Sequence, residues 1–350
     1  MFVLSFLLRS DPAIQVTQKG LPELSFHYRC YTVLILLVFC WCLPGIAAGR
    51  TVIDEVGERV EVPERAERVL PLAPSIAETL FALGLDRRIV GVTQFTTHPA
   101  AARKKPKVGS FYSPSIEKIL ALKPDLVIAG SEHQDEKIYA TLTHFRIPVY
   151  RVRPVDLETI YRMIRDLGKL AGTCSRAEEI VRQMQEKAAA VARRVAGKRP
   201  KKVFYQVGVD PIVAVNRHTF AADLIRRAGG LLVTADNPVR YPVYSIEKVI
   251  IAAPEVIIIS TMSPGTDYQR FRKTWERWKT VPAVREGRIF VIESDVVDRP
   301  SPRIVEGLAR LAEYIHGPPA GGPEGGSEER FEARPEMEAK KELKKKKENP

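Results

Sequence analysis

Residues 115–131 read SIEKILALKPDLVIAGS, and residues 245–261 read SIEKVIIAAPEVIIIST. The two stretches align without a gap at a constant offset (245 − 115 = 130). Ser115 and Ser245 each precede apolar residues at helical spacing, so their hydroxyls are expected to cap the first turn of a helix. A proline and an unbroken apolar run follow in both copies, which predicts that the helix stops before a strand buried on both faces. The sequence therefore predicts the same α/β unit twice, once in each of two similar lobes.

The sequence around the first copy predicts an N-terminal lobe over residues 50–157. It begins with a β-hairpin at residues 51–62, which alternate around Gly57. A loop at residues 73–75 leads into an amphipathic helix that continues through Leu83 and ends at Gly84. Short apolar runs predict three further strands, at residues 68–72, 89–92 and 148–152. Strands that alternate with helices in this way indicate a parallel, doubly wound sheet.

A helical connector is expected over residues 158–197, with a break near residues 172–175. Its second part, from Ser175 to Ala196, would span about 33 Å as one helix, enough to bridge two lobes. The C-terminal lobe, residues 198–317, repeats the plan of the first. Its expected elements are a strand at 203–207, a hairpin segment at 212–215, a helix at 219–227, a turn at Gly229–Gly230, the second repeat copy, a helix containing Trp275 and Trp278, a strand at 288–292 and a helix at 301–315. The tail, residues 318–350, is rich in Gly, Pro, Glu and Lys and is expected to be disordered.

The composition is that of a globular protein, with 45% hydrophobic and 27% charged residues. The net charge of +12 is not focused into a nucleic-acid-binding stripe, because part of it lies in the lysine run 344–347 and the rest is scattered. We therefore expect no nucleic-acid partner. Only Cys174 lies in the body of the chain, so no internal disulfide is expected. This cysteine precedes an expected helix start at Ser175, which favours a structural role.

The N-terminus has the pattern of an export signal. Arg29 precedes an apolar run over residues 31–43, and small residues follow at 44–49. This predicts a leader with a signal peptide over residues 1–49, cleaved near Ala48 or Gly49. The run is shorter than the roughly 20 residues of a membrane span. An uncleaved anchor is the alternative, and both readings place the body of the protein in the periplasm. A lipid anchor at Cys40 or Cys42 is disfavoured because small residues do not precede them.

The candidate ligand site follows from the topology. Open parallel sheets bind ligands beyond the carboxyl ends of their strands, so two facing lobes predict a cleft between them. The loops expected at those ends carry several aromatic residues and few charges, which suits a large, flat, amphipathic ligand. Each aromatic, taken singly, is also compatible with an ordinary core position. The candidate ligand-binding residues are Ser75, Phe95, Phe111, Tyr112, Tyr241, Tyr244, Asp295 and Arg299.

Enzymatic function finds little support in the sequence. Neither phosphate-binding glycine motif, G-x-x-x-x-G-K-[ST] or G-x-G-x-x-G, is present. The G-x-S-x-G nucleophile elbow, the H-E-x-x-H zinc motif and clustered Cys/His ligands are absent as well. We therefore predict no catalytic residues, no metal site and no cofactor. An exported structural or adhesive protein is a further alternative, and it would leave the paired loops without a role.

Three runs of the N-terminal lobe resemble substrate-binding proteins of ABC importers in the class with a helical backbone, which serve cobalamin, ferric siderophores and haem. They are RVLPLAPSIAETLFALGL (68–85), GVTQFTTHPA (91–100) and VGSFYSPSIEKILALKPDLVIAG (108–130). The cobalamin-binding members are most similar, through YQVGVDP (205–211), YPVYSIEKV (241–249) and SDVVDRPSPRI (294–304). The resemblance implies two Rossmann-like lobes with parallel sheets, a single long helix between them and no catalysis. It also implies a ligand cleft between the lobes and, as partner, a permease dimer with its ATPase subunits. The protein itself is expected to be a monomer.

The resemblance also assigns roles to single residues. Phe111 and Tyr241 stand where the cobalamin-binding members place tryptophans against the corrin, and Phe95 stands in place of a tyrosine. Asp295 and Arg299 match polar contacts to the amide side chains of the ligand. The expected ligand is cobalamin or a related corrinoid, and a ferric siderophore or haem is the alternative. Haem would need an axial ligand, for which the candidates are His98, His133, Tyr112, Tyr241 and Tyr244.

Glu117 and Glu247 are the candidate docking residues. Each falls in the first turn of its expected helix, where the helix dipole favours a carboxylate, and ordinary helix-start acids would look the same. Two such carboxylates related by the internal repeat offer a two-point contact to a two-fold symmetric permease. In the family that the sequence resembles, the matching pair docks onto permease arginines.

Overall fold

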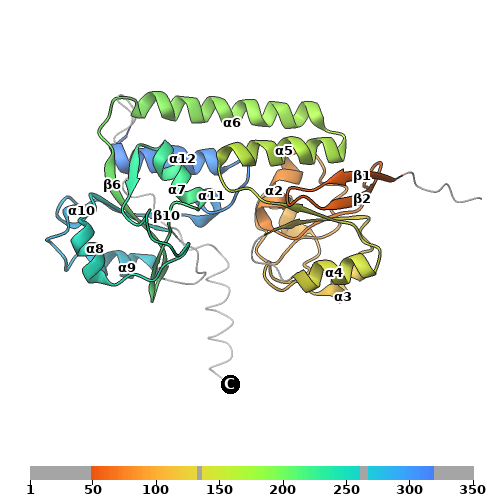
Figure 1. Ribbon diagram of the computed structural model, residues 1–350, viewed down its shortest axis with the longest axis horizontal. Coiled ribbons are helices and arrows are strands. Elements are labelled where there is room, and N and C mark those ends of the chain that lie inside the picture. Colours follow the sequence, from red (N-terminus) through yellow and green to blue (C-terminus); the bar gives the residue numbers. More distant parts are fainter. Residues whose placement is uncertain (1–48, 132–135, 261–266, 319–350) are drawn as a thin grey trace, which may run out of the picture. The chain divides into compact units, whose positions relative to one another are not determined.

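The computed structural model describes residues 49–131, 136–260 and 267–318 (Figure 1). The expected signal peptide, the candidate axial ligand His133 and the C-terminal tail beyond residue 318 lie outside the described residues. Within the described residues, no helix combines the length and the hydropathy that a membrane crossing needs.

The N-terminal lobe has a three-stranded parallel sheet in the order β3 (Val69–Pro71), β4 (Leu126–Gly130), β5 (Val149–Val152). The expected hairpin at its start is confirmed, because β1 and β2 pair antiparallel in one continuous register. Their bounds, with those of the helices of this lobe, are β1 (Gly49–Ile53), β2 (Arg59–Pro63), α2 (Pro74–Ala82), the 3₁₀ helix η1 (Ala100–Lys104), α3 (Ile116–Ala121) and α4 (Glu136–His144).

The strand expected at residues 89–92 is not formed as a strand. Ile89 makes a single parallel bridge to Val69, and Val92 makes another to Lys107. The segment thus changes its pairing partner within three residues, so no continuous ladder can develop. Alternating apolar residues alone did not distinguish this crossing segment from a strand.

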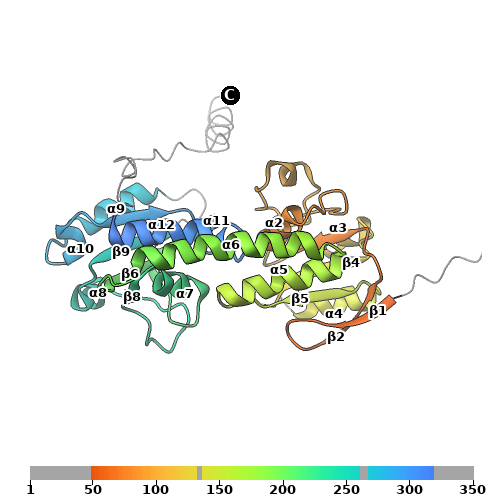
Figure 2. The same ribbon diagram turned by 90° about the horizontal axis from the view of Figure 1, so that it is seen from above.

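Two antiparallel helices link the lobes. α5 (Leu157–Ala171) begins with a capping box, in which the Asp156 carboxylate accepts from the amide of Thr159 and the Thr159 side chain accepts from that of Asp156. The expected break is confirmed at Gly172, whose φ of 72° ends α5 in the left-handed conformation. α6 (Cys174–Val195) is 22 residues long and packs against both α5 and α12 (Ile304–His316) (Figure 2). Cys174 is the exposed first residue of α6 and makes no disulfide, which does not support the structural role expected for it.

The C-terminal lobe is built on the long strand β6 (Lys201–Val209). Its sheet has the order β10-β9-β6-β7, and β8 pairs in parallel with the first residues of β6. Only β7 runs antiparallel, as the second strand of the expected hairpin. The other bounds are β7 (Ile212–Ala214), α7 (Phe220–Arg227), β8 (Gly230–Leu232), α8 (Ile246–Ala252), β9 (Val256–Ser260), α9 (Tyr268–Trp275), α10 (Pro282–Arg285), β10 (Ile289–Ile292) and α11 (Ser294–Val297).

Three local expectations in this lobe are wrong. Gly230 starts the strand β8 rather than completing a turn, and a Cβ there would lie 2.9 Å from the Val203 side chain of β6, so glycine permits the close approach. Trp278 lies beyond the end of α9. No helix was expected between the strand at 288–292 and the helix at 301–315, but α11 lies there, and its four residues are too few to show an apolar periodicity.

The repeated helix–strand unit is confirmed in both lobes. The hydroxyl oxygen of Ser115 accepts from the amide of Lys118 at 3.3 Å, and that of Ser245 from the amide of Lys248 at 3.5 Å. The strands that follow, β4 and β9, are buried along almost their whole length. Each unit also has a left-handed residue immediately before its proline, Lys123 with φ 44° and Ala253 with φ 48°. The internal repeat is thus a repeat of backbone conformation as well as of sequence.

The hydrophobic core explains how the lobes are held together. One cluster of buried residues is continuous through both lobes, and α5, α6 and α12 contribute to it. A second cluster lies on the other face of the C-terminal sheet and includes Val249 of α8. A third lies on the other face of the N-terminal sheet and includes Ile119 of α3. The shared cluster makes the two lobes one packed body on the side of the linking helices, while α3 and α8 cover the opposite sheet faces.

Candidate functional site

The four candidate residues of the N-terminal lobe differ in exposure. Ser75, in the first turn of α2, is buried. Phe95 and Tyr112 expose 47% and 62% of their surface, so both rings are available to a ligand. Phe111 is half-buried against the shared core and meets Tyr112 edge to face, with 5.1 Å between the ring centroids. This lobe therefore presents two aromatic rings to solvent and a third that is partly committed to packing.

The aromatic candidates of the C-terminal lobe are more strongly packed. Tyr241 is half-buried against the shared core, and the guanidinium of Arg240 lies over its ring at 5.7 Å. Tyr244 meets Phe204 edge to face at 6.0 Å, and its hydroxyl accepts from the side-chain amide of Asn237 at 3.4 Å. Phe111 and Tyr241 occupy equivalent positions of the internal repeat (241 − 111 = 130). Each lobe thus carries one half-buried aromatic just before its repeated helix.

The polar candidates Asp295 and Arg299 form a pair. Their side chains meet at 2.9 Å, one turn apart around α11. A second guanidinium nitrogen of Arg299 lies 3.7 Å from the carboxylate of Glu78, on α2 of the N-terminal lobe. Asp295 is buried. The pair expected from the sequence is therefore present, and it is joined to the opposite lobe.

Glu78 is a residue of this region that the sequence did not single out. Its side chain is only 2% exposed, and a carboxylate buried to that degree must be paired. The Arg303 guanidinium donates two hydrogen bonds to the two oxygens of Glu78, both at 2.9 Å. The Ser301 hydroxyl donates to the same carboxylate at 3.0 Å. Burial acts to lower the pKa of Arg303, but its hydrogen bonds to Glu78 and the charge of that carboxylate raise it above the usual value. Glu78 thus links α2 directly to the segment that precedes α12.

A third buried carboxyl fixes the end of α11. The Tyr205 hydroxyl donates to Asp298 at 2.8 Å, and the Ser260 hydroxyl donates to the other oxygen of the same carboxyl. Burial raises the pKa of Asp298 to about 6, even though both hydrogen bonds act to lower it. These contacts tie the residue next to Arg299 to the strands β6 and β9, so Arg299 projects from a firmly held turn.

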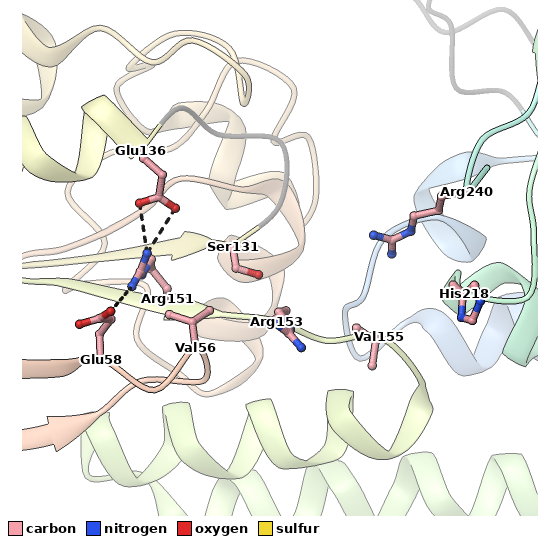
Figure 3. Close-up of a pocket in the computed structure, with 9 residues that line it drawn as sticks. All are labelled: Val56, Glu58, Ser131, Glu136, Arg151, Arg153, Val155, His218 and Arg240. Carbon is pink, nitrogen blue, oxygen red and sulfur yellow. Dashed lines mark hydrogen bonds and ion pairs between the residues drawn. The ribbon is translucent and has the colours of Figure 1, made fainter. Parts of the chain in front are cut away.

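A pocket of about 520 Å³ lies at the carboxyl ends of β4 and β5 (Figure 3). Residues of both lobes line it, and none of the eight candidate ligand residues is among them. Its lining residues are Val56, Glu58, Ser131, Glu136, Arg151, Arg153, Val155, His218 and Arg240. Topology predicted a site at these strand ends, but the arginines were not recognised because two lobes contribute them.

The two candidate docking residues lie on the surface. Glu117 and Glu247 are both exposed, each in the first turn of its helix, and neither forms an ion pair with any residue that the structure describes. The hydroxyl of Ser245 and the amide of Glu247 itself hold the pKa of the Glu247 carboxyl below its usual value. Both carboxylates are therefore available to a partner.

Metal ligation has little support in this part of the chain. Among the described residues, no group of three or more His, Cys, Asp or Glu side chains converges to hold a metal ion. His98 is exposed in the loop that precedes η1.

The profile of the periplasmic binding protein family matches residues 69–296, from β3 of the first lobe to α11 of the second. The chain belongs to the periplasmic binding protein family. The matched region contains both copies of the repeated unit and both linking helices, so the likeness extends over the two lobes.

Several members of the family are similar to this periplasmic binding protein. The vitamin B12-binding protein of Vibrio parahaemolyticus is 30% identical over 252 residues, which are 72% of this chain and 90% of that protein. The crystal structure of the periplasmic vitamin B12-binding protein of Vibrio cholerae has 26% identity and a TM-score of 0.64, and covers 71% of this chain and 96% of that one. The periplasmic haem-binding protein RhuT from Roseiflexus sp. RS-1 gives the same identity and TM-score, with 71% and 98% coverage.

Proposed function

We propose that this periplasmic binding protein is the exported solute-binding component of an ABC importer, and that it binds cobalamin or a related corrinoid between its lobes. The observation that carries the proposal is the 30% identity to a vitamin B12-binding protein over 90% of that protein's length. The function is capture and delivery of a ligand, without catalysis.

The proposed binding mode uses the residues that the strand-end loops present. Phe95 and Tyr112 offer exposed rings from the N-terminal lobe, and Phe111 and Tyr241 offer repeat-related rings, one from each lobe. Flat aromatic faces contribute a large contact area to a planar macrocycle at little cost in conformational entropy. Asp295 would accept hydrogen bonds from the amide groups at the corrin edge, Arg299 would donate to them, and Ser75 would line the base of the site.

Calorimetry with cyanocobalamin tests this proposal. We expect one ligand per chain, and we expect Phe111→Ala and Tyr241→Ala each to weaken binding about tenfold, because each removes about 1.4 kcal/mol of ring contact. Phe145→Ala is the control, since Phe145 is an aromatic ring outside the proposed site, 52% exposed and immediately after α4. Absence of heat and of thermal stabilisation with cyanocobalamin would refute corrinoid binding.

Haem is the second candidate ligand, because the haem-binding relative is as similar in structure as the vitamin B12-binding one. A phenolate or imidazole would have to ligate the iron, and the exposed Tyr112 and His98 are the candidates best placed to do so. Mixing with haemin would give a Soret band that shifts in Tyr112→Phe or His98→Ala. A spectrum that neither substitution changes would exclude ligation by these residues.

Delivery to a permease is proposed to use Glu117 and Glu247. Each carboxylate lies six positions after the repeat-related aromatic of its own lobe (117 − 111 = 6 and 247 − 241 = 6). One short segment in each lobe would thus carry both a wall of the ligand site and a docking contact. A permease that grips both helices could separate the two aromatic walls and release the ligand. Because α5, α6 and α12 share one core, we expect the lobes to move only slightly before docking.

A further inference from the structure

The pocket at the carboxyl ends of β4 and β5 has two chemically different parts (Figure 3). At one side, Arg151 is surrounded by carboxylates. At the other side, Ser131, Arg153 and Val155 of the N-terminal lobe face His218 and Arg240 of the C-terminal lobe. Both lobes therefore line the pocket, and one of its residues, Arg240, is the neighbour in sequence of the candidate ligand residue Tyr241.

Arg151 has a structural role. Its guanidinium lies 3.2 Å from Asp54, 3.2 Å from Glu136 and 3.9 Å from Glu58. The Asp54 side chain is fully buried, so this ion pair fastens the N-terminal hairpin to β5. Glu58 and Glu136, the two acids of the pocket, are both turned toward Arg151 (Figure 3). Three carboxylates thus share one guanidinium, so this side of the pocket is net acidic.

On the other side of the pocket, two donors have no acceptor among the described residues: the exposed Arg153 guanidinium and the buried Ser131 hydroxyl. Among the residues that the structure describes, the guanidinium of Arg153 has no hydrogen bond and no ion pair, and only its backbone amide is engaged, by Glu55. The Ser131 hydroxyl oxygen is buried and, within the same residues, also has no partner. A buried hydroxyl without a hydrogen bond costs about 1–3 kcal/mol. Arg240 points into the pocket from the opposite lobe (Figure 3).

We propose that this side of the pocket binds an oxyanion, a carboxylate or a phosphate group, that is carried by the ligand held between the lobes. Two guanidinium groups, an imidazole and a hydroxyl supply the donors that such a group accepts, and arginine suits it particularly because its planar fork can donate two parallel hydrogen bonds.

The position of Arg240 connects this subsite to the proposed ligand site, on which the inference rests. The Arg240 guanidinium lies over the ring of Tyr241, the proposed corrin wall of the same lobe. A ligand that stacks on Tyr241 would need only a short arm to bring an anionic group to Arg240 and Arg153. The expected ligand class is therefore a flat macrocycle or chelate with an anionic arm.

The test compares two corrinoids that differ in this group. Cyanocobalamin carries a phosphodiester in its nucleotide arm, and dicyanocobinamide lacks the arm. Calorimetry would be run with the wild-type chain, with Arg153→Gln, Arg240→Gln and the double variant, and with Arg285→Gln as control, because Arg285 is an exposed arginine on α10. Thermal unfolding of each variant checks that the fold is intact.

We expect the double variant to lose at least tenfold in affinity for cyanocobalamin and less than twofold for dicyanocobinamide. Raising NaCl from 0.1 to 0.5 M should weaken cyanocobalamin binding in the wild type more than in the double variant, because salt screens the ionic contact. An equal loss for both corrinoids, or no loss for either, would overturn the subsite.

Failure of the proposed function gives a different result. If the wild-type chain binds neither corrinoid but binds haemin, the corrinoid proposal falls, and haemin against its dimethyl ester then tests the subsite with the same variants. A selective loss of haemin affinity in the double variant would support an anion subsite. Stabilisation of the unliganded wild type, but not of the double variant, by millimolar inorganic phosphate without any effect on ligand binding would show a free-anion site and overturn the proposal.

Discussion

The α3–β4 unit of the N-terminal lobe and the α8–β9 unit of the C-terminal lobe have the same backbone plan, but they are tied into their lobes differently. Over residues 115–130 and 245–260 the burial of equivalent residues differs at only three pairs, Ser115/Ser245, Lys123/Ala253 and Gly130/Ser260. Each unit also accepts a backbone hydrogen bond through a carboxylate: Asp125 accepts from Arg68, just before β3, and Glu255 accepts from Lys202 of β6. The two units therefore share the backbone structure that places one glutamate on the surface of each lobe.

The surface residues around the two units differ between the lobes. Position 251 holds an isoleucine that is 83% exposed, and the equivalent position 121 holds an alanine. Tyr112 is exposed, whereas its counterpart Pro242 is buried. A two-fold symmetric partner would require the same helix–strand unit in both lobes. An asymmetric ligand would allow the residues that flank the two units to differ. The comparison therefore separates the proposed docking function from the proposed ligand specificity.

The largest effect on stability is expected in the core beneath α3 and α8. Ile119 and Val249 occupy equivalent positions and are fully buried. We expect Ile119→Ala to lower the free energy of unfolding by about 3 kcal/mol and Val249→Ala by about 2 kcal/mol, because each leaves a cavity. Urea denaturation measures both, with Ile251→Ala as an exposed control that should change little. A cost below about 0.5 kcal/mol at one position would show that the two units are not packed alike.

A second test concerns a buried carboxyl outside the repeated units. Burial raises the pKa of Glu55 from its usual 4.5 to about 7. Between these pH values the folded state holds more protons than the unfolded state, so the free energy of unfolding falls as the pH rises from about 4.5 to 7. We expect Glu55→Gln to remove this loss and to be more stable than the wild type at pH 8, by on the order of 2 kcal/mol.

Chemical denaturation at pH 5, 6, 7 and 8 measures this difference, with Glu61→Gln of the same hairpin as control. If the stability of Glu55→Gln ran parallel to that of the wild type across this range, Glu55 would not titrate as described.

A smaller effect on stability is expected at Asp125 and Glu255, the carboxylates that accept backbone hydrogen bonds in the two units. Asp125 accepts from the amides of Glu67 and Arg68 at 2.8 and 3.0 Å, while Glu255 accepts from the single amide of Lys202 at 3.0 Å. We expect Asp125→Ala to cost about 1.5 kcal/mol and Glu255→Ala about 1 kcal/mol, because the first leaves two backbone donors without their acceptor. Glu255 also accepts from the guanidinium of Arg199, but this ion pair lies on the surface and contributes little. Urea denaturation should give a lower midpoint for Asp125→Ala than for Glu255→Ala. The reverse order would contradict the two hydrogen bonds that Asp125 accepts.

The smallest expected effect lies at the left-handed residues. Lys123→Gly and Ala253→Gly should each raise the free energy of unfolding by about 0.5 kcal/mol, because glycine adopts positive φ without strain. Ala121→Gly, at the last residue of α3 where φ is helical, is the matched control and should lower it by about 0.5 kcal/mol. Destabilisation by glycine at both left-handed positions would argue against the shared backbone.

The repeated unit could be predicted from the sequence because its signals are local. A serine cap, a helical apolar period, a proline and a buried apolar run all lie within 16 residues. Neighbouring elements with weaker local signals were not predicted correctly. Residues 89–92 change pairing partner, and α11 has only four residues, so in both cases contacts distant in sequence decided the conformation.

The candidate site shows the same limit. The Asp295–Arg299 pair was predicted because both residues lie in one short segment after the last expected strand, and the resemblance assigns polar ligand contacts to both. Glu78 was overlooked because its partners Ser301 and Arg303 are more than 200 residues away. An acidic residue within the otherwise buried stretch Ser75–Leu80 was the available signal, since such a residue needs a cation nearby. Arg153 and Arg240 were missed for the same reason, because only the folded chain brings the two lobes together.

The most direct measurement of the central claim is the ATPase activity of the cognate transporter in the presence of this protein loaded with cyanocobalamin. We expect the double variant Glu117→Ala/Glu247→Ala to bind cyanocobalamin with wild-type affinity and to give no stimulation, and each single variant to give partial stimulation. The double variant Glu61→Ala/Glu286→Ala removes the same charge from exposed positions elsewhere and should stimulate like the wild type. Full stimulation by Glu117→Ala/Glu247→Ala would contradict the account.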